Sequence, residues 1–139
     1  MPIGRVALGD LDNLGRPTGV QASITKDMIG KGTPASQSIR PPGFQGGAAG
    51  HARGHLLGRQ LGGSGTDPRN LVTLRQNPTN SPVMLGFENQ VRAAVEGGEV
   101  VDFVATPIYR GNDLIPRAVT LSAEGSQGFR LEVTIINEL

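Results

Sequence analysis

Cysteine and tryptophan are both absent from this chain of 139 residues. Without cysteine the protein can form no disulfide bond and no thiolate zinc site, and it has no cysteine nucleophile. Aromatic residues make up only 4% of the sequence, so it offers no platform on which the bases of a single-stranded nucleic acid could stack. The hydrophobic core therefore has to be built from Leu, Val, Ile and Ala.

Long apolar segments are also missing. No stretch approaches the ~18 consecutive apolar residues that a membrane-spanning helix needs. The segment Met1 to Asp10 has neither the basic start nor the apolar run of a secretory signal peptide. We therefore expect no membrane segment, and we interpret residues 1–139 as a single domain cut from a larger protein.

The net charge is only +1, but the charges are unevenly distributed along the chain. Residues 26–75 contain seven basic and two acidic side chains, whereas residues 76–139 contain four basic and eight acidic ones. A basic middle segment on an acidic scaffold suits a phosphate-rich ligand. A solvated charged surface without a partner explains the same distribution equally well, so charge alone leaves both interpretations open.

Glycine and proline are frequent, with 21 and 10 copies. In residues 1–50 they leave room only for short strands and turns, and the best strand candidate there is 19–24. Ser81 and Pro82 predict the N-cap and first residue of a helix over 82–96, because apolar residues follow with helical spacing until two glycines end the pattern.

The last third of the chain is rich in β-branched residues. We predict strands over 99–109, 115–123 and 129–135, and the last of these alternates apolar and polar residues with period two. Turn residues at 111–113 and 125–128 would join the three strands into an antiparallel meander. Strands beside one helix predict an α+β fold with a mainly antiparallel sheet and a loop-rich N-terminal half.

Both histidines of the chain lie in one short segment, His51 to His55. Hydrolysis of a phosphodiester needs a base that activates water, a cation that stabilises the pentavalent phosphorus, and donors that orient the phosphate. On an extended strand, Arg53 and His55 would point to the same face. A base and a phosphate donor are therefore expected side by side.

Oxygen ligands for a cation occur further along the chain, at Asn80 and Glu88. On a helix their Cα atoms would be ~12 Å apart along the axis, so both could not bind one ion directly. Because helical side chains lean toward the N-terminus, Glu88 could hold the waters of a hydrated ion that Asn80 contacts. Such a site suits Mg²⁺, with Mn²⁺ as a substitute. Taken singly, Asn80 is better explained as a capping residue and Glu88 as part of a solvated helix face.

A series of short motifs follows in a specific order and spacing. The sequence contains Leu14-Gly15-Arg16, Pro41-Pro42-Gly43-Phe44, Arg53-Gly54-His55-Leu56-Leu57-Gly58, Leu61-Gly62-Gly63, Arg69-Asn70-Leu71, Asn80 with Met84 and Glu88, and Pro107-Ile108-Tyr109-Arg110-Gly111. This series resembles the secreted DNA/RNA non-specific endonucleases of the ββα-metal, or His-Me finger, superfamily. The resemblance extends over nearly the whole chain.

The resemblance implies a role for each matching residue. His55 is similar to the family's general base, Asn80 to its direct metal ligand and Glu88 to its outer-sphere carboxylate. Arg53 would contact the phosphate, and Asn70 would support the site by hydrogen bonds. The metal would be Mg²⁺ or Mn²⁺.

The sequence departs from the family pattern at one position. Ala52 stands where the Asp-Arg-Gly-His motif has an acidic residue, so that carboxylate does not orient Arg53. His51 has no counterpart with a role in the family, and we interpret it as a surface or loop residue.

The resemblance also predicts an organisation of the domain. A Gly- and Pro-rich part, 1–50, would precede a ββα-metal finger motif over 51–96, and antiparallel strands over 99–137 would follow. The substrate would be DNA and RNA. The expected nucleic-acid contacts are the arginines Arg53, Arg59, Arg69 and Arg75.

Relatives of this kind include free secreted nucleases and the C-terminal toxin modules of bacterial delivery systems. The lack of a signal peptide and the end of the chain at Leu139 favour the toxin module, delivered into a target cell. Its partner would be an acidic immunity protein that covers the basic segment.

Two further alternatives come from other classes of protein. A zinc hydrolase would use His51 and His55, which have the spacing of a helical zinc pair, but Gly50 and Gly54 disfavour a helix and Ala52 replaces the required Glu. A non-catalytic nucleic-acid-binding module would need the basic segment but neither His55 nor a metal ligand.

Overall fold

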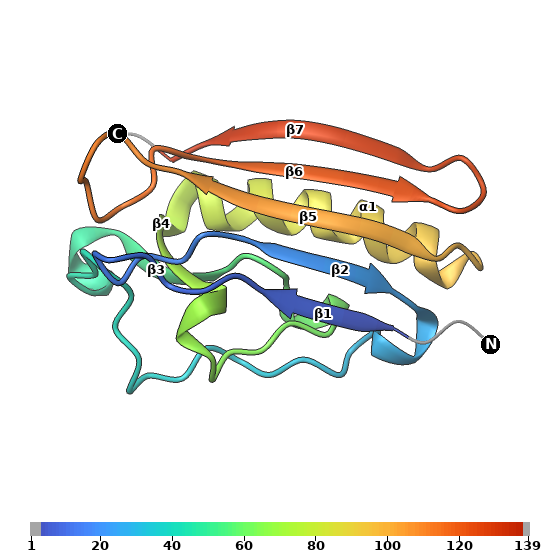
Figure 1. Ribbon diagram of the computed structural model, residues 1–139, viewed down its shortest axis with the longest axis horizontal. Coiled ribbons are helices and arrows are strands. Elements are labelled where there is room, and N and C mark those ends of the chain that lie inside the picture. Colours follow the sequence, from blue (N-terminus) through green and yellow to red (C-terminus); the bar gives the residue numbers. More distant parts are fainter. Residues whose placement is uncertain (1–3, 138–139) are drawn as a thin grey trace.

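A five-stranded antiparallel sheet dominates the computed structural model, which describes residues 4–137 (Figure 1). Residues 1–3 and 138–139 of the predicted domain lie outside the described residues. The order across the sheet is β1-β2-β5-β6-β7. Its strands are β1 (Arg5–Leu8), β2 (Val20–Ile24), β5 (Val101–Ile108), β6 (Ala118–Gly125) and β7 (Arg130–Ile136).

The predicted antiparallel meander is confirmed by the registers of β5 with β6 and of β6 with β7. The strand predicted over 115–123 begins three residues later, at Ala118. The preceding residues belong to a loop instead, because the Pro116 carbonyl accepts a hydrogen bond from the side chain of Asn137 and Arg117 N–H donates to Ile108 O. Strand β1 had no distinct signal in the sequence.

Helix α1 (Leu85–Glu96) lies across one face of the sheet (Figure 1). Its Val91 and Val95 side chains are fully buried in the hydrophobic core. The preceding segment, η5 (Gln76–Met84), is kinked, because Asn77 and Ser81 within it are extended. Each of these two residues precedes a proline, whose ring disfavours helical dihedral angles in the residue before it. An extended Ser81 followed by helical residues up to Leu85 agrees with the predicted N-cap at Ser81 and helix start at Pro82.

The remaining two strands form a separate hairpin, in which β3 (His51–His55) pairs with β4 (Leu71–Arg75). Strand β4 continues directly into η5 and α1, so β3, β4 and α1 form a ββα unit. Short 3-10 turns complete the elements: η1 (Lys26–Met28), η2 (Gly47–Ala49), η3 (Arg59–Leu61) and η4 (Pro68–Asn70). Within residues 4–137, no helix has the length and apolar character needed to cross a membrane.

The hairpin and the sheet are tied together by the side chain of Asn137, which is only 5% exposed. Its Nδ2 donates to Thr73 O at 3.1 Å and to Pro116 O at 2.7 Å, and its Oδ1 accepts from the Arg75 N–H at 2.8 Å. One amide group therefore holds β4, the loop before β6 and the end of β7 in a fixed arrangement.

Replacement of Asn137 by alanine should destabilise the protein by about 2–4 kcal/mol, because it leaves buried backbone groups without hydrogen-bond partners. Urea denaturation of the wild type and Asn137→Ala measures this difference. Asn112→Ala, in an exposed turn, is the matched control and should change stability by less than about 0.5 kcal/mol. Equal stabilities of the two variants would contradict the role given to Asn137.

Candidate active site

His55 lies at the end of β3, where a loop of the N-terminal half passes over it. Its Nε2 is 2.9 Å from the carbonyl oxygen of Thr33. A carbonyl oxygen can only accept a hydrogen bond, so in the neutral ring Nε2 carries the hydrogen and Nδ1 carries the lone pair. This contact therefore selects the tautomer in which Nδ1 can act as a base.

The surroundings of His55 favour its neutral form. Burial lowers the pKa of His55 below its usual 6.5, the hydrogen bond with Thr33 acts in the opposite direction, and the positive charge of Arg59 lowers the pKa further. The ring is therefore ready to accept a proton near neutral pH.

Glu88 projects from the first turn of α1 onto the backbone of Gly58. A Cβ atom at position 58 would lie 2.5 Å from the Glu88 carboxyl carbon, so only glycine permits this approach. Burial raises the pKa of Glu88 to about 7, and a hydrogen bond with Gln60 partly offsets that effect. A carboxyl group in this position would be stabilised in its charged form by a nearby cation.

Asn80 belongs to η5 and not to α1, so the helical spacing expected between Asn80 and Glu88 is wrong. The fold nevertheless brings both residues to one pocket of about 540 Å³, which His55 also lines. Asn80 Nδ2 donates to Gln76 Oε1 at 3.1 Å, which leaves its Oδ1 as an oxygen ligand for a cation.

No group of three His, Cys, Asp or Glu side chains that could hold a metal ion occurs in the described part of the chain. A cation between Asn80 and Glu88 would therefore keep several water molecules. Amide and carboxylate oxygens together with retained water suit a hard divalent cation.

Asn70 is buried beneath the loop that follows β3. Its Oδ1 accepts from Leu57 N–H at 2.9 Å, and its Nδ2 donates to Leu57 O at 3.0 Å and to Ser64 O at 2.8 Å. These three bonds hold the backbone between His55 and Gly63 in one conformation. Its contacts are all with the protein backbone, next to the residues that line the pocket.

Arg53 is held by the segment that runs along β3. Its Nε donates to Ile39 O at 2.6 Å and its Nη2 to Gln37 O at 3.0 Å, and the guanidinium lies 4.3 Å from the Phe44 ring centroid. Backbone carbonyls thus orient the side chain without a carboxylate at position 52.

His51 is the first residue of β3, so it does not lie in a loop, and its partly exposed side chain agrees with a place at the surface. Its Nδ1 accepts a hydrogen bond from Gln45 N–H at 3.0 Å. Four residues of extended strand separate it from His55 by about 13 Å. The strand therefore removes the helical zinc pair on which the zinc-hydrolase alternative depended.

The other arginines expected at the nucleic acid are dispersed. Arg59 lines the pocket with His55, whereas Arg75 lies at the far end of β4. Arg69 forms a two-pronged ion pair with Asp67, with Nη2 to Oδ2 at 2.7 Å. The basic segment is thus not one continuous surface.

Several features of the pocket were missed by the sequence analysis. The Thr33 carbonyl oxygen belongs to the backbone, so the identity of the residue does not reveal its contact with His55. Three residues that line the pocket lie outside the sequence motifs, namely Gln60, Asn89 and Arg92. Gln60 donates to Asn89 Oδ1 at 3.0 Å, which links the loop after β3 to α1. Gly58 ends the motif 53–58, and its lack of a side chain could have indicated that another group packs against its backbone.

The fold is shared with solved nuclease structures. NucA from Streptococcus agalactiae with magnesium bound gives a TM-score of 0.86 at 23% identity, and the match covers 99% of this chain and 72% of NucA. Sda1 nuclease with bound zinc gives 0.81 at 23% identity, over 97% and 76% of the two chains. A structure described as an extracellular endonuclease gives 0.73 at 26% identity, over 99% and 80%.

These similarities confirm the predicted fold class, with its ββα-metal motif beside a mainly antiparallel sheet. No curated protein sequence matches the chain. A family model, in contrast, matches residues 4–127. The chain therefore belongs to the DNA/RNA non-specific endonuclease family.

Proposed function

We propose that the protein hydrolyses phosphodiester bonds of DNA and RNA with a divalent metal ion and with His55 as the general base. The observation that carries the proposal is that His55, Asn80 and Glu88, distant in sequence, line one pocket. Nδ1 of His55 would take a proton from water, the water oxygen would attack phosphorus, and the P–O ester bond to the leaving oxygen would break.

The metal of this proposal is Mg²⁺, with Mn²⁺ as a substitute. Asn80 would hold the ion directly and Glu88 through water, in agreement with the oxygen donors at the pocket. When bound, the ion supplies positive charge that stabilises the phosphate and the leaving oxygen. The neighbour NucA was solved with magnesium and Sda1 with zinc, and the lack of a three-residue ligand cluster among residues 4–137 favours magnesium here.

Other residues would assist the reaction. Arg59 faces the same pocket as His55 and would contact the phosphate there. Arg53 would contribute positive charge beside the site, Arg69 would reach a phosphate only by exchanging its ion pair with Asp67, Arg75 would act further along β4, and Asn70 would hold the loop after β3 in place. The domain of this activity would be the whole of residues 1–139.

Removal of the general base should abolish most of the activity. His55→Ala should lower the rate of plasmid cleavage by ~10² to 10⁴ while the protein still binds nucleic acid. His51→Ala is the matched control and should keep the wild-type turnover number, because His51 does not line the His55 pocket. If His51→Ala is the inactive variant, the assignment of the base is wrong.

The same assignment predicts the response to pH. Arg59, Glu88 and Arg92 face His55 across the pocket. Since burial and Arg59 lower the pKa of His55 below 6.5, the base is neutral at pH 7 and activity should fall only as the pH drops below about 6.5. A rate profile of the wild type between pH 4.5 and 8 at constant ionic strength measures this fall. A loss of activity centred above pH 7 would contradict it.

Cleavage should depend on the metal. EDTA should abolish it, Mg²⁺ or Mn²⁺ should restore it, and Zn²⁺ should substitute poorly. Asn80→Ala should reduce activity sharply because it removes the direct ligand, and Glu88→Gln should reduce it less because it only loosens the water shell. Full activity in EDTA would exclude the proposed mechanism.

Thermal unfolding provides a second test of the metal that does not depend on activity. The stability contributed by neutral Glu88 is complete below pH 4.5 and is lost as the pH rises through about 7. At pH 8 in EDTA, Glu88→Gln should therefore be more stable than the wild type, by about 2–3 kcal/mol. Added Mg²⁺ should stabilise the wild type more than the variant. Equal Mg²⁺ shifts would place the ion elsewhere.

The proposed setting lies outside the producing cell. Two structural neighbours are described as an extracellular endonuclease and an extracellular nuclease, which supports secretion or delivery. In a C-terminal toxin module, an acidic immunity protein would cover the basic segment and the His55 pocket. Expression inside a naive bacterium should then degrade nucleic acid and stop growth, while His55→Ala should be tolerated. Normal growth with active enzyme in the cytoplasm would exclude the toxin and favour a free scavenging nuclease.

A further inference from the structure

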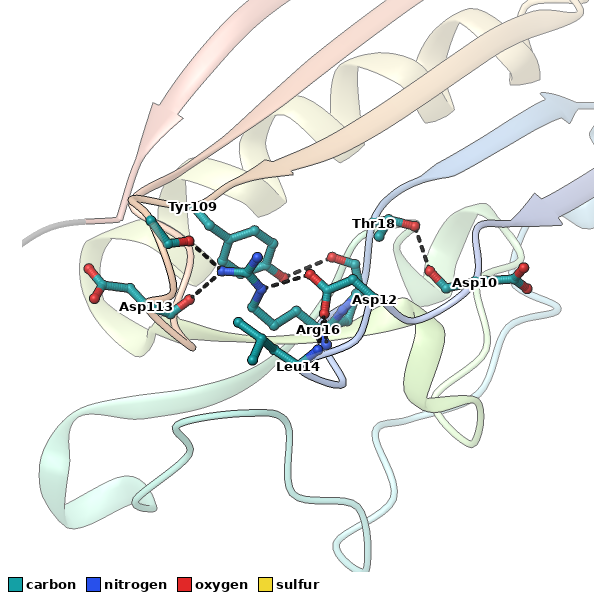
Figure 2. A network of polar contacts seen from close by, with 9 residues as sticks. Asp10, Asp12, Leu14, Arg16, Thr18, Tyr109 and Asp113 are labelled. Atoms are coloured by element: carbon teal, nitrogen blue, oxygen red, sulfur yellow. Dashed lines mark hydrogen bonds and ion pairs between the residues drawn. The ribbon is translucent and has the colours of Figure 1, made fainter.

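Arg16 connects two sequence motifs that do not line the His55 pocket, 14–16 and 107–111 (Figure 2). The Arg16 Nε donates to Asp12 Oδ2 at 2.8 Å, and its Nη1 donates to the carbonyl oxygens of Gly111 at 2.8 Å and Asp113 at 3.0 Å. The guanidinium lies 4.3 Å from the ring centroid of Tyr109. Arg16 thus attaches the loop 109–117, between β5 and β6, to the N-terminal part.

The other end of the same loop is attached by Asn137, through the hydrogen bond to Pro116 O. Arg110 and Arg117 flank these anchored positions on the loop, and both line a second pocket of about 370 Å³ together with Arg75 of β4. Asp113 also lines this pocket, so the four side chains sum to +2. Three arginines from two separate segments, the loop 109–117 and β4, therefore line one pocket.

Such an arrangement has the chemistry of a phosphate site. Guanidinium groups bind phosphate through paired hydrogen bonds. The pocket is not the one that His55, Asn80 and Glu88 line. The three arginines of the second pocket therefore have no part in the proposed proton transfer.

The distance between the second pocket and His55 matches the spacing of phosphates along a nucleic acid. Leu71 is the cross-strand partner of His55, and Arg75 lies four residues further along β4, at about 13 Å. This distance corresponds to about four base steps along one strand of a B-form duplex. A nucleic acid cleaved at His55 could therefore present another phosphate to Arg75, Arg110 and Arg117.

We propose that this pocket is a second phosphate-binding site, which holds the substrate backbone several nucleotides from the cleaved bond, with Arg16 as its positioning residue. The inference rests on the proposed nuclease function. It assigns Arg110 and Arg117 to substrate binding and gives the anchored loop 109–117 a function.

The test compares long and short substrates. In the His55→Ala background, Arg110→Gln/Arg117→Gln should weaken binding of a labelled 20-nucleotide single strand about tenfold at 0.1 M salt, and should reduce the salt slope by about 0.7 for each lost contact. With His55 intact, the double variant should hydrolyse bis(p-nitrophenyl) phosphate, which is too short to reach the second pocket, at the wild-type rate. Arg130→Gln, exposed on β7, is the matched control and should bind the strand like the wild type.

Arg16 is tested by the same pair of substrates. Arg16→Gln should raise KM for the long strand and leave turnover of the short diester unchanged, whereas general destabilisation would reduce both. Unchanged affinity and salt slope in the double variant would overturn the second site and leave the nuclease function intact. A wild-type protein that binds through these arginines but cleaves nothing would overturn the nuclease function alone.

Discussion

The close approach of helix α1 to the loop after β3 is the constraint on which the candidate site depends. The approach is possible because residue 58 has no side chain, so the Glu88 carboxyl group can lie directly on the backbone. Leu56, Leu57 and Leu61 are fully buried beside it and secure the contact through apolar packing. The loop after β3 and the first turn of α1 thereby line one pocket.

This packing buries two titratable groups, Glu88 and His55, and burial disfavours the charged form of each. A buried carboxyl group without a cation favours its neutral form, as the raised pKa of Glu88 shows. The same burial lowers the pKa of His55, which favours a neutral base. The protein fold thus places a carboxyl group that a nearby cation would stabilise in its charged form beside a histidine whose neutral form is favoured.

Some arginines of this protein form contacts within the fold and others line its pockets, and a count of charges along the sequence does not distinguish the two groups. Arg16, Arg53 and Arg69 are engaged with carbonyls, an aromatic ring or a carboxylate of the protein itself. These contacts hold loops against strands, in a chain with many Gly and Pro residues and few long elements. Arg59 faces the first pocket and Arg75 the second, so the positive charge is concentrated at two places and not along a continuous face.

The sequence by itself determined the fold class, the family and most of the strands. Period-two alternation located β7, and a segment rich in β-branched residues located β5, because a half-buried strand imposes such patterns locally. Strand β2 was located as the best strand candidate between the glycines and prolines of the first 50 residues. The order of short motifs was enough to recognise the family, now supported by a match over residues 4–127. Local rules failed just before Pro82, since the extended backbone of Ser81 breaks the helical spacing expected between Asn80 and Glu88.

Only the tertiary structure decided how the candidate site is assembled. The partner of His55 is a backbone carbonyl 22 residues earlier in the chain, and a carbonyl leaves no signature in the identity of its residue. The convergence of Arg75, Arg110 and Arg117 likewise follows from Arg16 and Asn137 anchoring one loop at both ends. Long-range contacts of this kind depend on how elements pack, and no local pattern of residues encodes that packing.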